Sequence, residues 1–165
     1  MSSAVMLAER TPLALGPVAA GGGDTITVET RLGAVLAHRD ATIEMPQGPL
    51  GFARHTRFAL VDLPNPNLGR FKLLQSLDAA EVSFVVAPVE AESGPIERAD
   101  LDEACRAAGL APADLLVLLI VTVRSAPGGV TLTANLRAPV IVDVQKRVGR
   151  QVVLANASYA VRHPI

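Results

Sequence analysis

One serine, one histidine and one aspartate in this chain could in principle form a hydrolytic triad. Ser76 stands two residues before Asp78, and His163 lies near the C-terminus. A triad is defined by geometry, in which a base activates the hydroxyl group and a carboxylate orients the base. The local sequence LLQSLD lacks the G-x-S-x-G turn that exposes the nucleophile of α/β-hydrolases. A small hydrolase that uses Ser76 and His163 is therefore only the alternative hypothesis.

The other reactive side chains are isolated in the sequence. Cys105 falls among alanines in a helical pattern, where a thiol is buried and inert. His38, His55 and His163 form no H-x-x-x-H pair and no cysteine–histidine spacing of the kind that binds zinc. We expect no catalytic residue, no metal site and no cofactor.

Composition narrows the class of protein. The chain has 165 residues, half of them apolar, and a net charge of −1, with four Phe, one Tyr and no Trp. Few rings and no basic excess argue against direct nucleic-acid or membrane binding. One cysteine permits no disulfide within the chain and fits a reducing cytoplasm. The longest apolar run, residues 115–123, is too short to span a bilayer. The oligomeric state stays open.

The chain divides near residue 24. Residues 1–24 have mixed polarity, an early proline and three consecutive glycines at 21–23, and no basic region that would precede an export signal. They are predicted to be a flexible tail. Residues 25–165 are predicted to form a single domain.

Most of that domain has strand character. Short apolar or alternating runs separated by turn residues cover 26–37, 41–45, 57–63, 71–77, 82–89, 115–123, 131–136, 139–144 and 150–155. One helix is predicted from Asp100, with Glu103 at capping-box spacing, to Gly109. We therefore predict a mainly β fold, a small antiparallel β-barrel or sandwich-like single domain with one short helix.

The stretch TLTANLRAPVIVDV, residues 131–144, places three unusual residues inside a strand pattern. Alternation directs Leu132, Ala134 and Leu136 to the core and Thr131, Thr133 and Asn135 away from it. Pro139 cannot donate to a ladder, so it marks a bulge or a break between two strands. Arg137 and Asn135 are either solvated residues at a bend or an outward-facing contact surface.

Gln75 lies on the same face of its predicted strand as Phe71 and Leu73, which is the core side. A buried amide must find hydrogen-bond partners, so we expect Gln75 to bond backbone groups.

Taken together, the motifs resemble the flagellar assembly factor FliW family. IEMPQGPLGFARHTRFALVD, LLQSLD, SFVVAPV, LLVLLIVTV, LTANLRAPVIVD, GRQVVL and YAVRHPI occur in the family's order over residues 25–165. The motif residues include Gln75, Ser76, Pro139, Tyr159, Arg162 and His163.

The resemblance implies a cytoplasmic, non-enzymatic regulator of flagellar assembly. It would bind flagellin and the translational repressor CsrA, and would antagonise CsrA by exchanging one partner for the other. The polar side chains that we expect at a partner surface are Asn135 and Arg137 at the bend, and Arg150 and Gln151 on a neighbouring strand.

Overall fold

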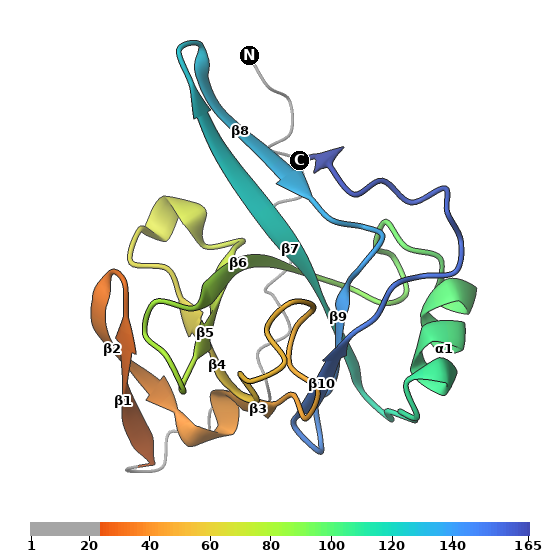
Figure 1. Cartoon of the computed structure of the whole chain (residues 1–165), viewed down its shortest axis with the longest axis horizontal. Coiled ribbons are helices and arrows are strands. Elements are labelled where there is room, and N and C mark those ends of the chain that lie inside the picture. Colours follow the sequence, from red (N-terminus) through yellow and green to blue (C-terminus); the bar gives the residue numbers. More distant parts are fainter. Residues whose placement is uncertain (1–23) are drawn as a thin grey trace.

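The computed structural model describes residues 24–165, so the tail expected at residues 1–24 lies outside the described residues except for Asp24. The described chain contains eleven strands, one α-helix and two short 3-10 helices (Figure 1). The strands are β1 Thr25–Thr30, β2 Gly33–His38, β3 Thr42–Glu44, β4 Arg57–Asp62, β5 Lys72–Ser76, β6 Ser83–Val89, β7 Leu115–Ala126, β8 Gly129–Ala134, β9 Val140–Asp143, β10 Val148–Gln151 and β11 His163–Pro164. The helix α1 spans Arg98–Ala107, and the 3-10 helices are η1 Arg39–Ala41 and η2 Pro66–Leu68.

Seven strands close into a barrel. The pairings run β7-β6-β5-β4-β3-β10-β9 and return from β9 to β7. All are antiparallel except the contact of β3 with β10, which is a single parallel pair of Val148 with Glu44. At this seam the Glu44 N–H donates to the carbonyl of Arg147 at 2.8 Å. The mainly β, barrel-like prediction is confirmed.

The long strand β7 organises the barrel. Its first part, Leu115–Leu118, pairs with β9, and its second part, Val121–Ala126, pairs with β8. The chain must therefore bend between β8 and β9, over residues 135–139. The run LLVLLIVTV, predicted as a buried central strand, forms most of β7.

The first part of β7, residues 115–121, is apolar without interruption because both of its faces are buried. Leu116 and Leu118 point into the barrel, where they pack with Ile43, Phe58 and Leu74. The alternate residues Leu115, Val117, Leu119 and Val121 form a second core with α1 and the C-terminal segment. A strand covered on both faces gives a continuous apolar run instead of an alternating one. A third, smaller core lies between β4, β5 and the β1–β2 hairpin.

The N-cap of helix α1 lies three residues earlier than Asp100, which the capping-box spacing with Glu103 had suggested. The N-cap is Glu97, which makes no side-chain capping bond, and Asp100 lies in the first turn. The C-terminal prediction is correct: Gly109 has a φ of 69°, and the Leu110 N–H donates to the Cys105 carbonyl at 2.9 Å. This is the left-handed glycine stop of a Schellman motif. Within residues 24–165, no helix has the length and apolarity needed to cross a bilayer.

Candidate functional site

The residues between β8 and β9 form a bend that Asn135 holds closed. The Asn135 Oδ1 accepts hydrogen bonds from the N–H groups of Arg137 and Ala138, each at 3.0 Å. The Asn135 N–H still donates to the carbonyl of Ile120 in β7 at 2.9 Å. Asn135 is half-buried. Its amide therefore mimics a backbone turn at the point where the chain changes its partner segment on β7.

The facing assignment for this segment is confirmed. Ala134 and Leu136 are buried in the core beside α1, and the partly buried Leu132 packs against the same core. Pro139 is buried and its carbonyl accepts a bond from the Val152 N–H at 3.0 Å. Because proline has no N–H, Pro139 and Val152 share one backbone hydrogen bond, whereas a non-proline residue at position 139 could also donate one.

Arg137 and Gln151 fasten the bend to the chain beyond β10. The Arg137 Nε donates to the Leu154 carbonyl at 2.8 Å, and the Leu154 N–H donates to the Arg137 carbonyl at 2.8 Å. The Gln151 Nε2 donates to the Ala138 carbonyl at 3.1 Å, while its Oε1 accepts from the Leu50 N–H at 2.8 Å. Gln151 thus joins the loop after β3 to the bend.

Arg150 lies on the same strand and reaches the end of α1. Its Nη1 donates to the Ala108 carbonyl at 3.3 Å. The C-terminal end of a helix carries partial negative charge, so the positive Arg150 side chain is stabilised there. Arg150 also borders a small pocket of about 110 Å³ at the seam, together with Pro46, Gly48 and Leu110. The four polar residues expected at a partner surface are therefore gathered around β10 and the bend. Each of them holds backbone in place, and their contact with a partner stays a prediction.

Ser76 is buried and fully engaged. Only 2 % of the residue is exposed, and its Oγ accepts bonds from the N–H groups of Asp78 at 3.1 Å and Ala79 at 3.2 Å. The histidine ring beside it belongs to His55, whose Nδ1 lies 3.3 Å from Oγ. His163 instead lies in β11, opposite Ala134 of β8. The pairing of Ser76 with His163 that the hydrolase hypothesis required is therefore not the one formed.

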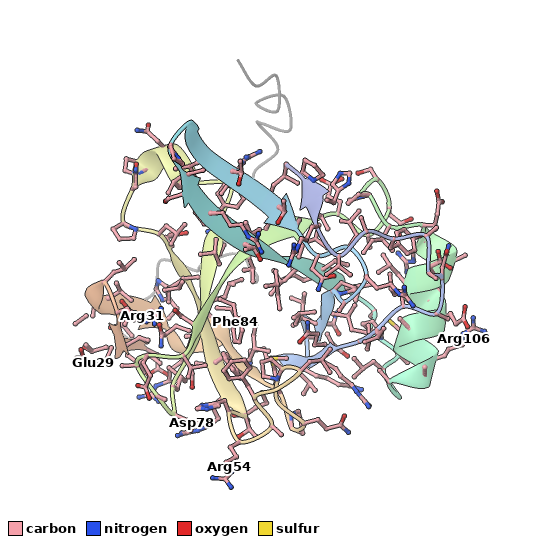
Figure 2. The ribbon with its side chains drawn as sticks, turned by 45° about the horizontal axis from the view of Figure 1, so that its top comes forward. Glu29, Arg31, Arg54, Asp78, Phe84 and Arg106 are labelled. Atoms are coloured by element: carbon pink, nitrogen blue, oxygen red, sulfur yellow. The ribbon has the colours of Figure 1, made fainter. Side chains whose placement is uncertain are left out.

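The carboxylate beside Ser76 also has a structural partner. The Asp78 Oδ1 accepts from the Arg57 Nη2 at 2.9 Å, and its Oδ2 accepts from the N–H groups of Thr56 and Arg57. The Arg57 hydrogen bond lowers the pKa of Asp78 below its ordinary value. Figure 2 shows Asp78 at the end of the sheet, with Arg54 pointing away into solvent. This carboxylate locks the β5–β6 turn to the start of β4.

Gln75 is completely buried and bonds backbone, as its facing predicted. Its Nε2 donates toward the carbonyls of Ser76 at 3.0 Å and of Ala80 and Val82 at 3.1 Å each. The amide thereby closes the β5–β6 turn from inside.

The remaining motif residues lie in the C-terminal segment. The Tyr159 hydroxyl donates to the Asp100 carboxylate at 2.5 Å and accepts from the Glu97 N–H at 3.0 Å. Burial and the bond to Asp100 raise the pKa of Tyr159. Arg162 and His163 are exposed, and β11 pairs with the end of β8. Tyr159 therefore satisfies the helix N-terminus that lacks a side-chain cap.

Cys105 packs in the core beneath α1 with 5 % of its surface exposed, and burial raises the pKa of its thiol. Among residues 24–165, no three histidine, cysteine or carboxylate side chains lie together in a way that could hold a metal ion.

The sequence interpretation missed one surface. Val123 and Val130 are 52 % and 64 % exposed on the hairpin formed by the ends of β7 and β8. They pair across the hairpin with Leu132 and Ser125, respectively. Alternation over residues 121–134 could have placed both valines on the apolar face, but the length of the hairpin beyond the barrel depends on where β6 stops.

These contacts define a small β-barrel whose polar motif residues hold turns and seams and do not assemble a triad. The model of the family described as FliW protein matches residues 26–165. Flagellar assembly factor FliW of Geotalea uraniireducens is 36 % identical over 136 residues, covering 82 % of this chain and 80 % of that protein. Flagellar assembly factor FliW of Syntrophus aciditrophicus is 33 % identical over 147 residues, covering 82 % and 84 %.

Solved structures agree with these matches. A crystal structure of the flagellar assembly factor FliW superposes with a TM-score of 0.61 at 26 % identity, covering 84 % of this chain and 95 % of the other. The chain belongs to the FliW family. The resemblance found in the motifs is confirmed, and the family assignment supports a role in flagellar assembly.

Proposed function

We propose that this protein is a non-enzymatic, cytoplasmic regulator of flagellar assembly that binds flagellin and antagonises CsrA. The observation that carries the proposal is the match to FliW over residues 26–165, which spans nearly all of the described chain. In this scheme flagellin and CsrA compete for the protein. When free flagellin falls, more of the protein is available to bind CsrA, by mass action.

The geometry around Ser76 favours contact over catalysis. A nucleophile must reach its substrate, and the Ser76 hydroxyl is 2 % exposed and accepts two backbone hydrogen bonds. The Asp78 carboxylate is bonded to Arg57 and does not orient the His55 ring. This arrangement stabilises a turn.

Charge is distributed unevenly in a way that suits a basic partner. Residues 90–106 carry six carboxylates and two arginines, a net charge of −4, whereas the whole chain has a net charge of −1. Within this segment, the side chains of Glu92 and Asp102 are 75 % and 52 % exposed, and both pair with Arg98. RNA-binding proteins of the CsrA type carry basic surfaces, so complementary charge would speed and strengthen their encounter with this face.

Arg137 at the bend and Arg150 on β10 retain donors for a partner. A guanidinium group has five N–H donors. Arg137 uses its Nε and Arg150 uses one Nη1 hydrogen in the bonds described above. We therefore keep Arg137 and Arg150 as proposed contacts, together with the less available amides of Asn135 and Gln151.

Calorimetric titration with purified flagellin and CsrA of the same organism tests the proposal. We expect micromolar or tighter complexes with each partner, and a weaker affinity for one when the other is present. The absence of a complex with either partner would reject the proposed function. Binding of both without mutual effect would reject only the exchange.

A charge variant tests the acidic face. Glu103→Lys on α1 should weaken the CsrA complex, more at low salt than at high salt. Glu29→Lys is the matched control because it makes the same change of charge on β1, and Figure 2 shows Glu29 on the side of the barrel away from α1. Equal weakening by both variants would show a general charge effect and no contact at α1.

A further inference from the structure

The β1–β2 hairpin forms a sheet of its own outside the barrel. Its strands pair from Thr25 with His38 to Thr30 with Gly33, and in the described chain they pair with no strand of the barrel. Figure 1 shows the hairpin at the edge of the molecule, beside β4 and β5. Within residues 24–165, no hydrogen bond or ion pair joins residues 25–38 to the seven barrel strands. Side-chain packing therefore holds the hairpin on the barrel.

The packing beneath the hairpin is thin. The inward side of the hairpin contributes Val28 and Ala37, which are 2 % and 6 % exposed. They form one cluster with the outer face of the sheet at Ala59, Val61 and Leu73. Two of these five side chains are alanines, so the apolar area that the cluster removes from water is small. Burial of such area is what stabilises a two-stranded hairpin, which is marginal on its own.

The space under the hairpin is also imperfectly filled. A pocket of about 190 Å³ lies between β1 and the β5–β6 turn, lined by Val28, Glu29 and residues 76–80. Gln75 pairs with Ala59 on the same side of the sheet, and its Oε1 is buried without a hydrogen-bond partner among the described residues. An unfilled volume forfeits contact energy, and an unsatisfied buried acceptor costs free energy. Water entering beneath the hairpin would relieve both penalties.

The hairpin is fastened at one end and free at the other. The Arg147 Nη1 donates to the Arg39 carbonyl and to the Asp40 carboxylate, each at 3.2 Å, which ties η1 to the β9–β10 turn. The Arg39 N–H donates to the Asp24 carbonyl at 2.9 Å and closes the open end of the hairpin. At the turn, Leu32 is 62 % exposed. This arrangement places a hinge at residues 39–40.

We propose that the β1–β2 hairpin is a flap that opens about η1 while the seven-stranded barrel stays folded. Opening uncovers the apolar outer face of β4 and β5 and gives the Gln75 Oε1 access to water. The barrel keeps its closed ring of strand pairings and its two larger cores in the open state. Segments with few buried contacts open locally at a lower free energy than the whole domain. This inference is independent of the proposed function, because it rests only on how the hairpin is held.

Amide hydrogen exchange of the wild-type protein in increasing urea tests the flap directly. We expect the paired amides of β1 and β2 to exchange at least tenfold faster than those of β4 and β5. Their exchange should also depend less on urea, because local opening exposes less surface than global unfolding. Equal rates with equal urea dependence would show that the hairpin unfolds only with the barrel, and would overturn the proposal.

Thiol labelling compares the two faces of the sheet. Val61→Cys places a thiol under the flap, where Val61 is 5 % exposed, and Val86→Cys places one inside the barrel, where Val86 is 0 % exposed. Wild-type protein, with its buried Cys105, gives the background. Without denaturant, a thiol reagent should modify Val61→Cys at least tenfold faster than Val86→Cys, and equal rates would reject the flap. If either variant fails to fold, the exchange of the wild type decides.

A third comparison weakens the contact that holds the flap. Val28→Ala should speed exchange in β1 and β2 several-fold and leave exchange in β7 unchanged. Leu36→Ala is the matched control, because Leu36 lies on the outer face of the same hairpin with 75 % exposure, and it should change neither. The proposal falls if Val28→Ala speeds exchange in the barrel by the same factor. It also falls if Leu36→Ala speeds the hairpin as much as Val28→Ala, since the effect would then arise within the hairpin.

Discussion

Removal of the Asn135 side chain gives a sharp test of the bend. In Asn135→Ala, the N–H groups of Arg137 and Ala138 lose their acceptor, which lies 3.0 Å from each of them. A hydrogen bond contributes about 0.5–1.5 kcal/mol net, so two lost bonds should lower the free energy of unfolding by about 1–3 kcal/mol. The half-buried position lets water partly replace the amide, which favours the lower half of this range.

Leu136→Ala provides a reference value for the loss in the free energy of unfolding. Leu136 is 5 % exposed in the core, and truncation of a buried leucine lowers the free energy of unfolding by about 2–5 kcal/mol. The leucine variant should therefore be the less stable of the two. At roughly 4 °C per kcal/mol for a domain of this size, the lower half of the range, about 1–2 kcal/mol, should lower the Tm of Asn135→Ala by about 4–8 °C.

Urea unfolding followed by far-UV circular dichroism measures both variants. Asn135→Asp is the matched control, because a carboxylate oxygen can accept the same two N–H groups, and it should stay close to the wild type. The reasoning is refuted if Asn135→Asp is as unstable as Asn135→Ala. Equal losses from Asn135→Ala and Leu136→Ala would show that the bend depends on more than these two bonds.

Three further changes test other parts of the fold. The Arg57 bond lowers the pKa of Asp78 below its ordinary value of 3.8, so this carboxylate stabilises the fold above about pH 4 and loses its effect as pH falls through the lowered pKa. Asp78→Asn should accordingly unfold more easily at pH 7 in urea titrations, and a difference from wild type that persists undiminished at pH 2 would contradict this. Tyr159→Phe loses the bonds to Asp100 in the first turn of α1 and to the N–H of the N-cap residue Glu97. The loss should cost about 1–2 kcal/mol of unfolding free energy and speed amide exchange in α1. Unchanged exchange there would contradict the capping role. Gly48→Ala should fold poorly or melt well below wild type by calorimetry, because the φ of Gly48 is 62° and a Cβ would lie 2.2 Å from a backbone oxygen. Gly33→Ala is the control: Gly33 also has a positive φ, but a Cβ there would meet no atom within 4 Å, so this variant separates the clash from the backbone strain.

Local features were predictable because they depend on neighbours along the chain. Alternation identified the inward face of Leu132, Ala134 and Leu136, and it also placed Gln75 in the core. Gly109 stops α1 as the sequence indicated, since this position has a left-handed backbone conformation that glycine adopts without strain. The N-cap was misplaced by three residues, because the helix N-terminus is satisfied from a distance by Tyr159 and not by a local side-chain cap.

By itself, the sequence determined a mainly β domain, the inward and outward faces of its strands and, through its motifs, membership of the FliW family. Only the tertiary structure decided which distant groups meet. The barrel closes through Glu44 and Val148, and Ser76 meets His55 instead of His163. The β7–β8 hairpin extends beyond Ile120, where β6 ends its pairing with β7. Side-chain alternation follows from the geometry of one strand, whereas these pairings depend on how all the strands pack together around the core.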